Sequence, residues 1–262
     1  MPVSTDLWFN LGKANPSAKL RLFCFPYAGG SAAVFSDWNM RLGGDIEVVA
    51  VQPPGRGNRF VEEPIASLDE TIRQLVQAIT PLLDKPFAFF GHSNGALVCF
   101  ELARALARMG RLEGLRHIVV SGNPAPQVRT FDSMLHSLPD EELKGKLRDL
   151  RGTPEEILQN AELLEVFMPV LRADFSIAET YDYAHAPPLE CDLSIFGGLE
   201  DHNISREDLL AWGELFRGSV EMTMFEGGHF FINEDRATVL SALRSCLDNA
   251  MAGAGGLTYG KA

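Results

Sequence analysis

Short apolar runs alternate with amphipathic stretches along the first half of the chain. The runs at residues 20–25, 46–51, 87–90 and 117–121 are short and mainly apolar, which predicts buried strands. Helices are predicted at 31–42, 67–83 and 96–109, the second opened by the capping box Ser67-Leu-Asp-Glu70. Unbroken apolar strands between amphipathic helices are typical of a mostly parallel sheet that helices cover on both faces.

The pattern changes between residues 126 and 188, where only helical pieces are predicted. They include a capping box at 153–156 and an amphipathic stretch at 161–181 interrupted by Pro169. Strands then return at 193–196 and 220–225, with helices after Ser205 and at about 234–247. We therefore expect an α/β core at 1–125 and 189–248, with 126–188 as a helical lid over the carboxyl ends of the strands. The small, Gly-rich tail at 249–262 is predicted to be disordered.

The net charge and the cysteine content limit which partners and which cellular compartment we expect for the chain. The 262-residue chain has 23 Lys+Arg against 35 Asp+Glu, a formal net charge of −12, which argues against nucleic acid and anionic membranes as partners. Residues 1–10 lack the pattern of a signal peptide, and no apolar run has the length of a membrane span. Its four cysteines contain no Cys-x-x-Cys pair, so we expect reduced thiols in a cytoplasmic protein, which we take to be a monomer.

The segment Gly91-His92-Ser93-Asn94-Gly95 is a Gly-x-Ser-x-Gly motif. It occurs by chance in roughly one chain in ten of this length, so its context matters. Here it follows a predicted strand directly and opens a predicted helix, as a nucleophile elbow requires. The sharp turn lifts the serine clear of the sheet, and the helix N-terminus offers free N–H groups to a developing oxyanion.

A serine nucleophile needs a general base and an acid that orients it, in the chain order Ser, acid, His. His229 follows the predicted strand at 220–225 and two glycines, whereas His136 and His185 fall in the helical insertion. Asp201 follows the strand at 193–196, and the competing acids are Glu200 and Asp192, the latter at the opposite end of its strand.

The loop at 24–30 occupies the place of the second half of an oxyanion hole, where Tyr27 or Ala28 would direct an N–H group at the serine. We expect His92 to be a packed structural residue rather than a second base. The sequence contains no phosphate-binding glycine loop and no histidine spacing typical of a metal site.

Four blocks in order, within residues 20–247, resemble a known family. They are Phe25-Pro-Tyr-Ala-Gly-Gly30, Pro54-Gly-Arg56, Gly91-His-Ser-Asn-Gly-Ala96, and Gly227-Gly-His-Phe-Phe231 preceded by the Asp201 turn. The chain resembles the type II thioesterases, stand-alone α/β-hydrolases that accompany polyketide and nonribosomal peptide synthetases. This resemblance implies hydrolysis of acyl thioesters from the phosphopantetheine arm of carrier proteins, clearing stalled or aberrant acyl groups.

The resemblance also implies roles for individual residues. Ser93 would be the nucleophile, His229 the base and Asp201 the acid, with the N–H groups of Ala28 and Asn94 forming the oxyanion hole. Family members commonly carry methionine at the position of Asn94, so a polar side chain here would alter acyl preference. No metal or diffusible cofactor is implied, since the phosphopantetheine belongs to the substrate.

Two other functions remain open from the residues alone: a carboxylesterase or lipase acting on free small esters, and a non-enzymatic interaction module. Carrier proteins are generally acidic, so a chain with a charge of −12 needs a local basic or apolar docking patch. Arg56, Arg59 and the stretch 144–151 are candidates for it. The large apolar residues of the insertion are expected mainly to pack it: Phe131, Met134, Phe167, Met168 and Phe175.

Overall fold

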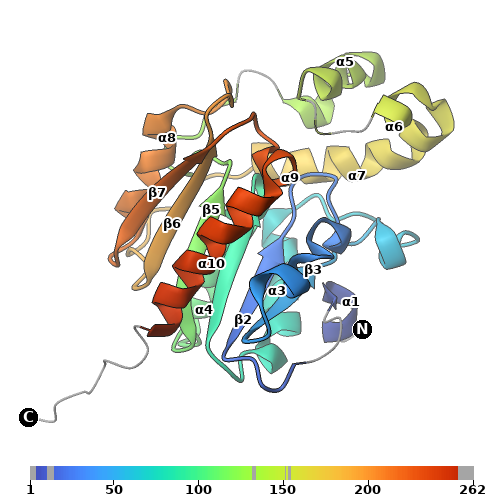
Figure 1. Cartoon of the computed structure of the whole chain (residues 1–262). Coiled ribbons are helices and arrows are strands. Elements are labelled where there is room, and N and C mark those ends of the chain that lie inside the picture. Colours follow the sequence, from blue (N-terminus) through green and yellow to red (C-terminus); the bar gives the residue numbers. More distant parts are fainter. Residues whose placement is uncertain (1–3, 11–14, 132–133, 151, 153–154, 253–262) are drawn as a thin grey trace, which may run out of the picture.

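The computed structural model describes residues 4–10, 15–131, 134–150, 152 and 155–252 (Figure 1). Within them, seven strands form one sheet in the order β1-β3-β2-β4-β5-β6-β7. The strands are β1 (Phe9–Asn10), β2 (Leu20–Phe25), β3 (Ile46–Val51), β4 (Phe87–His92), β5 (Leu115–Ser121), β6 (Asp192–Gly198) and β7 (Val220–Phe225). All neighbouring pairs are parallel except β1 with β3.

Helices cover both faces of the sheet because alternate residues of its strands point to opposite sides. Phe23 and Phe25 of β2 belong to the apolar core under α3 (Leu68–Ile79) and α4 (Asn94–Arg108). Leu22 and Cys24 belong to the second core, under α2 (Trp38–Leu42) and α10 (Arg236–Ala252). Figure 1 shows α10 running across one face of the sheet. The remaining short core helices are α1 (Thr5–Trp8), α8 (Arg206–Leu210) and α9 (Phe231–Glu234).

In the described residues between β5 and β6, three α-helices gather at one end of the sheet (Figure 1). They are α5 (Asp140–Leu150), α6 (Glu155–Gln159) and α7 (Ala161–Glu179). Leu143, Leu147, Leu158, Met168 and Leu171 form a small apolar core of their own. We call α5, α6 and α7 the lid helices.

Several element boundaries differ from the predicted ones. The predicted helix at 31–42 is a 3₁₀ turn, Ala32–Phe35, followed by the separate α2. Pro169 does not interrupt α7: proline removes one backbone donor, and burial of Met168, Val170 and Leu171 around it offsets that loss. The predicted capping box at 153–156 begins outside the described residues.

The predicted disordered tail also begins too early. Helix α10 continues through residues 249–252, and Ala250 is buried against the core. Residues 253–262 lie outside the described residues. Strand β1, which the sequence analysis did not predict, pairs for only two residues with β3.

In the part of the chain that the structure describes, no helix is long and apolar enough to cross a membrane. The four cysteines, Cys24, Cys99, Cys191 and Cys246, are free and buried.

Candidate active site

Ser93 stands on the sharp turn between β4 and α4. It is the only non-glycine residue of the described ranges with a positive φ, at 52°. Its N–H donates to the carbonyl of Ser121 on the neighbouring strand over 2.7 Å, which anchors the turn to the sheet.

Two glycines flank the serine because the backbones meet there without room for side chains. A Cβ on Gly95 would lie 2.1 Å from the carbonyl oxygen of Phe25, at the end of β2. A Cβ on Gly91 would lie 2.2 Å from the carbonyl oxygen of Gly95. The Gly-x-Ser-x-Gly spacing is therefore a steric requirement of pressing α4 against the end of the sheet.

The structure brings the three predicted catalytic side chains together. His229, on the loop after β7, has its Nε2 atom 3.0 Å from Oγ of Ser93. Its Nδ1 atom lies 2.6 Å from Oδ2 of Asp201, on the loop after β6. The Asp201 side chain is 4% exposed and that of His229 is 19% exposed, so the acid is shielded from water while the base faces the site. This is the order nucleophile, base, acid that proton transfer from a serine requires.

The competing residues lie elsewhere. Glu200 is exposed, and Asp192, at the start of β6, accepts a hydrogen bond from the N–H of Ser219 over 2.8 Å. His136 contacts Glu179 through Nδ1 over 2.6 Å, and His185 is exposed.

His92 is packed against His229. It is fully buried, its Nδ1 lies 2.8 Å from Oγ of Ser121, and its ring centroid is 5.3 Å from that of His229. Burial, and secondarily the nearby His229, holds the pKa of His92 well below its usual range. A lowered pKa favours the neutral form of His92 beside His229, as expected for a packed structural residue.

Two backbone N–H groups at the active-site cavity have no hydrogen-bond partner among the described residues. Asn94 is the first residue of α4, where N–H groups have no partner inside the helix. The N–H of Ala28, on the loop after β2, donates no hydrogen bond to any described residue. Ala28 and Asn94 line the same cavity as Ser93 and His229.

That cavity has a volume of about 370 Å³ and lies between the ends of the strands and the lid helices. Its walls include both apolar and charged residues of the insertion: Phe131, Leu147, Leu171, Phe175, Arg129, Lys146 and Glu179. Of the large apolar residues expected to pack the insertion, Phe167, Met168 and Phe175 belong to the apolar core of the lid helices. Phe131 lines the cavity, and so does Phe175.

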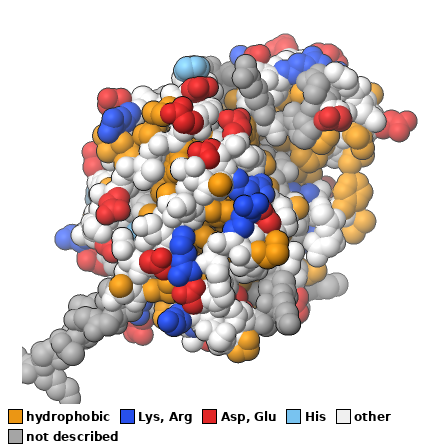
Figure 2. Space-filling model, in the orientation of Figure 1, with side chains coloured by type: hydrophobic (Ala, Val, Ile, Leu, Met, Phe, Trp, Pro, Cys, Tyr) orange, Lys and Arg blue, Asp and Glu red, His pale blue; other side chains and the backbone are white. Residues whose placement is uncertain are grey.

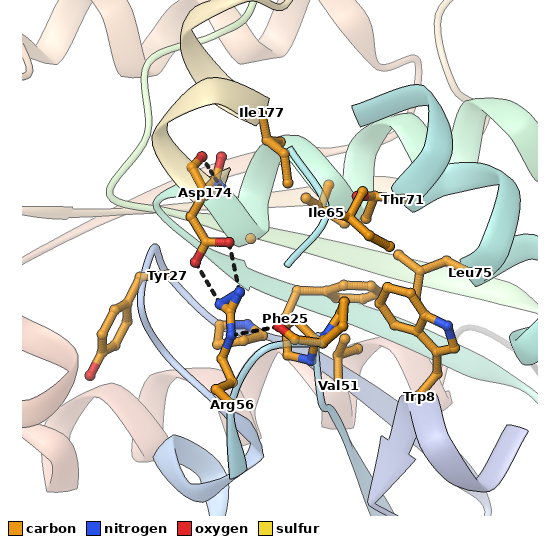
Figure 3. A pocket seen from close by; sticks show the side chains of 16 residues that line it. Trp8, Phe25, Tyr27, Val51, Arg56, Ile65, Thr71, Leu75, Asp174 and Ile177 are labelled. Atoms are coloured by element: carbon orange, nitrogen blue, oxygen red, sulfur yellow. Dashed lines mark hydrogen bonds and ion pairs between the residues drawn. The ribbon is translucent and has the colours of Figure 1, made fainter. Parts of the chain in front are cut away.

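Figure 3 shows a second, smaller cavity, with a volume of about 40 Å³. Its wall is mostly apolar, formed by residues such as Trp8, Phe25 and Ile177. Tyr27, Asn94 and Asp174 line both cavities and separate them. The Asn94 side chain donates to the backbone carbonyl of Asp174 over 3.0 Å, so it is directed at a lid helix.

Two basic residues predicted for docking are buried instead. Arg56 is 6% exposed and binds both carboxylate oxygens of Asp174, and Arg59, 4% exposed, pairs with Glu62. Neither is available to a partner, because each guanidinium satisfies a carboxylate of the chain itself. On the face shown in Figure 2, basic and acidic side chains are interspersed.

Among the described residues, no group of three or more His, Cys, Asp or Glu side chains is placed to hold a metal ion.

A serine, a histidine and an aspartate hydrogen-bonded in this order at the end of a mostly parallel sheet define a serine hydrolase of the α/β type. Within that class the chain belongs to the thioesterase family, since residues 20–247 match the thioesterase domain. The fold class and the family resemblance predicted from the sequence are confirmed.

Named relatives agree with this family. The gramicidin S biosynthesis protein GrsT of Aneurinibacillus migulanus is 42% identical over 229 residues, 87% of this chain and 89% of GrsT. The type II thioesterase BorB from the borrelidin biosynthetic cluster superposes with a TM-score of 0.84 at 36% identity, covering 92% of this chain and 98% of BorB. The thioesterase RedJ from the prodiginine pathway of Streptomyces coelicolor gives a TM-score of 0.81 at 37% identity, covering 89% and 88%.

Proposed function

We propose that the chain is a type II thioesterase, which hydrolyses acyl or aminoacyl thioesters from the phosphopantetheine arm of carrier proteins. Its place would be beside a polyketide or nonribosomal peptide synthetase, removing stalled or aberrant acyl groups. The observation that carries the proposal is the Ser93–His229–Asp201 hydrogen-bonded series opening into the 370 Å³ cavity, in a chain of the thioesterase family.

The chemistry follows from the positions of these three side chains. Ser93 Oγ attacks the thioester carbonyl while Nε2 of His229 takes its proton, and Asp201 stabilises the imidazolium that forms. The tetrahedral intermediate collapses, the C–S bond breaks, and the imidazolium returns the proton to the thiolate. Water, deprotonated by His229, then attacks the acyl-serine and releases the carboxylic acid.

The oxyanion of each tetrahedral intermediate would accept hydrogen bonds from the N–H groups of Ala28 and Asn94. Removing one such donor costs on the order of a hundredfold to a thousandfold in turnover. Every group that this mechanism uses belongs to the chain, to water or to the substrate, whose phosphopantetheine arm is part of the carrier. The mechanism therefore calls for no metal and no diffusible cofactor.

Carrier docking would use the lid side of the molecule. With Arg56 and Arg59 buried, the described part of the remaining candidate stretch, residues 144–150, lies on α5, where Lys146 is exposed and lines the cavity. A cation at that position suits an acidic carrier and the phosphate at the base of its arm. We expect the chain to act as a cytoplasmic monomer.

The second candidate function is a carboxylesterase or lipase acting on free small esters, because the same three side chains cleave oxygen esters. The test compares one short acyl group presented on a holo carrier protein, on N-acetylcysteamine and as a p-nitrophenyl ester, with Ser93→Ala as control. Much faster release from the carrier, lost in the control, is the expected result. Equal or faster cleavage of the free ester would favour the esterase.

A further inference from the structure

Asp174 of the lid helix α7 makes hydrogen bonds to two loops of the core and to the first residue of helix α4. Its Oδ2 accepts from the N–H of Gly29 over 2.7 Å and from Nη1 of Arg56 over 2.6 Å. Its Oδ1 accepts from Nη2 of Arg56 over 2.7 Å, and its backbone carbonyl accepts from the side chain of Asn94 over 3.0 Å. Figure 3 shows the carboxylate of Asp174 in direct contact with the guanidinium of Arg56.

Two of these partners belong to the oxyanion site. Asn94 supplies one of its N–H groups, and Gly29 directly follows Ala28, which supplies the other. The packing of α7 restricts the same loop: Gly29 has a φ of 77°, and a Cβ there would lie 2.9 Å from Leu171 and 3.1 Å from Phe167. The lid helix thus fixes the loop of Ala28 both by a charged hydrogen bond and by close packing.

The charge of Asp174 needs neutralisation at this position. The carboxylate is buried at 5% exposure, and burial raises its pKa, against the opposing effects of Arg56 and the Gly29 N–H. An unpaired carboxylate lining the cavity would repel the negative charge that develops on the substrate oxygen. The bidentate Arg56 removes that repulsion while leaving Asp174 able to hold Gly29.

We propose that Asp174 is a positioning residue: by docking helix α7 on the core, it fixes the positions of both N–H donors of the oxyanion hole. Arg56 is its counter-ion. This inference rests on the proposed function, because it assumes that Ser93 reacts with an acyl carbonyl. It predicts that the lid contributes to the chemical step and not only to the shape of the acyl cavity.

A second buried carboxylate with similar partners, Glu47, serves as a control that separates an effect on positioning from an effect on stability. Glu47 is also buried, at 4% exposure, and it also accepts from an arginine and from a backbone N–H: Arg21 Nε over 2.8 Å and Asn15 N over 2.9 Å. It lies at the start of β3, whereas the active site lies at the other end of the strands. Glu47→Gln therefore removes an equivalent buried charge without touching the oxyanion loops.

The first test compares Asp174→Asn with Glu47→Gln. The amide has one acceptor oxygen. With that oxygen in the place of Oδ2, the N–H group faces Nη2 of Arg56 and the hydrogen bond to Gly29 is no longer charged; in the other orientation the N–H group faces both Gly29 and Nη1 of Arg56. We expect kcat to fall about tenfold to a hundredfold in Asp174→Asn, with KM changed less than about threefold. Glu47→Gln should lower the melting temperature comparably and leave kcat within about twofold. Equal kcat in the two variants would overturn the inference.

The second test restores stability without restoring the contact. In the double variant Arg56→Met/Asp174→Leu, apolar side chains replace the buried ion pair, an exchange that is often neutral or stabilising. A purely structural ion pair predicts that activity recovers with the melting temperature. The inference predicts that kcat remains low in a protein of wild-type stability, because Gly29 has lost its acceptor. Full recovery of kcat would therefore contradict it.

Labelling of Ser93 by a fluorophosphonate separates this inference from the proposed function. The phosphoryl oxygen of the probe uses the same two N–H groups, and no carrier or thioester is involved. Slower labelling of Asp174→Asn than of Glu47→Gln is expected whichever acyl substrate the enzyme prefers. If the wild type is labelled but hydrolyses no carrier thioester, the proposed function fails while the labelling ratio still decides the role of Asp174.

Discussion

Asp201 and His229 lie on loops that are joined to each other through their backbones. The N–H of Leu199 donates to the carbonyl of Phe225 over 2.8 Å, and the N–H of Glu200 donates to that of Gly227 over 2.9 Å. The 2.6 Å contact between Asp201 Oδ2 and His229 Nδ1 follows from this pairing of the loops. The acid therefore fixes the orientation of the imidazole.

Asp201→Asn should lower kcat by about a thousandfold to ten-thousandfold, because the imidazole loses the acceptor that fixes its tautomer. Glu200→Gln is the matched control, since this neighbouring carboxylate is exposed. Steady-state hydrolysis of an acyl thioester measures both. A severe loss in Glu200→Gln with little change in Asp201→Asn would show that the acid is misassigned.

His229→Ala should abolish hydrolysis and slow fluorophosphonate labelling of Ser93, because no other base lies within hydrogen-bond distance of its Oγ in the described residues. His202→Ala changes a nearby exposed histidine and should keep wild-type activity. Circular dichroism would check that both variants remain folded. Retained activity in His229→Ala is the result that would remove this residue from the mechanism.

Gly95→Ala should prevent the elbow from forming, since the new methyl group would lie 2.1 Å from the carbonyl oxygen of Phe25. We expect a loss of several kcal/mol in the free energy of unfolding, or no folded protein. Gly145→Ala, on α5 with no atom within 4 Å of the added Cβ, should instead raise stability by about 0.5–1 kcal/mol. Urea denaturation compares the two, and a stable, active Gly95→Ala would refute the steric argument.

His117 should make stability fall on mild acidification. Its ring is buried against Ser194, and burial lowers its pKa from 6.5 to about 4. Between these values the unfolded chain binds a proton that the folded protein does not, so the free energy of unfolding decreases as the pH falls. One histidine contributes about 1.4 kcal/mol per pH unit. His117→Gln should flatten the pH dependence of the free energy of unfolding by that amount between about pH 6.5 and 4. Parallel curves for wild type and variant would show that folding does not lower the pKa of His117.

The sequence predicted the elements and residues whose signals are local. Strands β2, β3 and β7 have the predicted bounds, because each is a short, mainly apolar run. Ser93, Asp201 and His229 each follow a predicted strand, and parallel strands bring their carboxyl ends to one edge, so their proximity was predictable from topology.

Features set by distant contacts were not predictable in this way. Arg56 and Asp174 are 118 residues apart, and nothing near Arg56 shows that its charge is buried and paired, so it was wrongly considered for docking. The two-residue strand β1 is too short to produce a periodic pattern. The extension of α10 beyond residue 248 depends on packing of Ala250 against the core. The composition of the tail does not indicate this packing.

The backbone pairing of the Asp201 and His229 loops has a consequence for movement of the lid. Those loops are held by β6 and β7, whereas the loop of Ala28 is held in part by α7. Displacement of α7 would leave the contact between Asp201 and His229 intact. It would release the loop that carries the N–H of Ala28. Without α7 in place, Ser93, His229 and Asp201 would stay aligned while the Ala28 N–H lost its fixed position, so hydrolysis would be slow until α7 docks again.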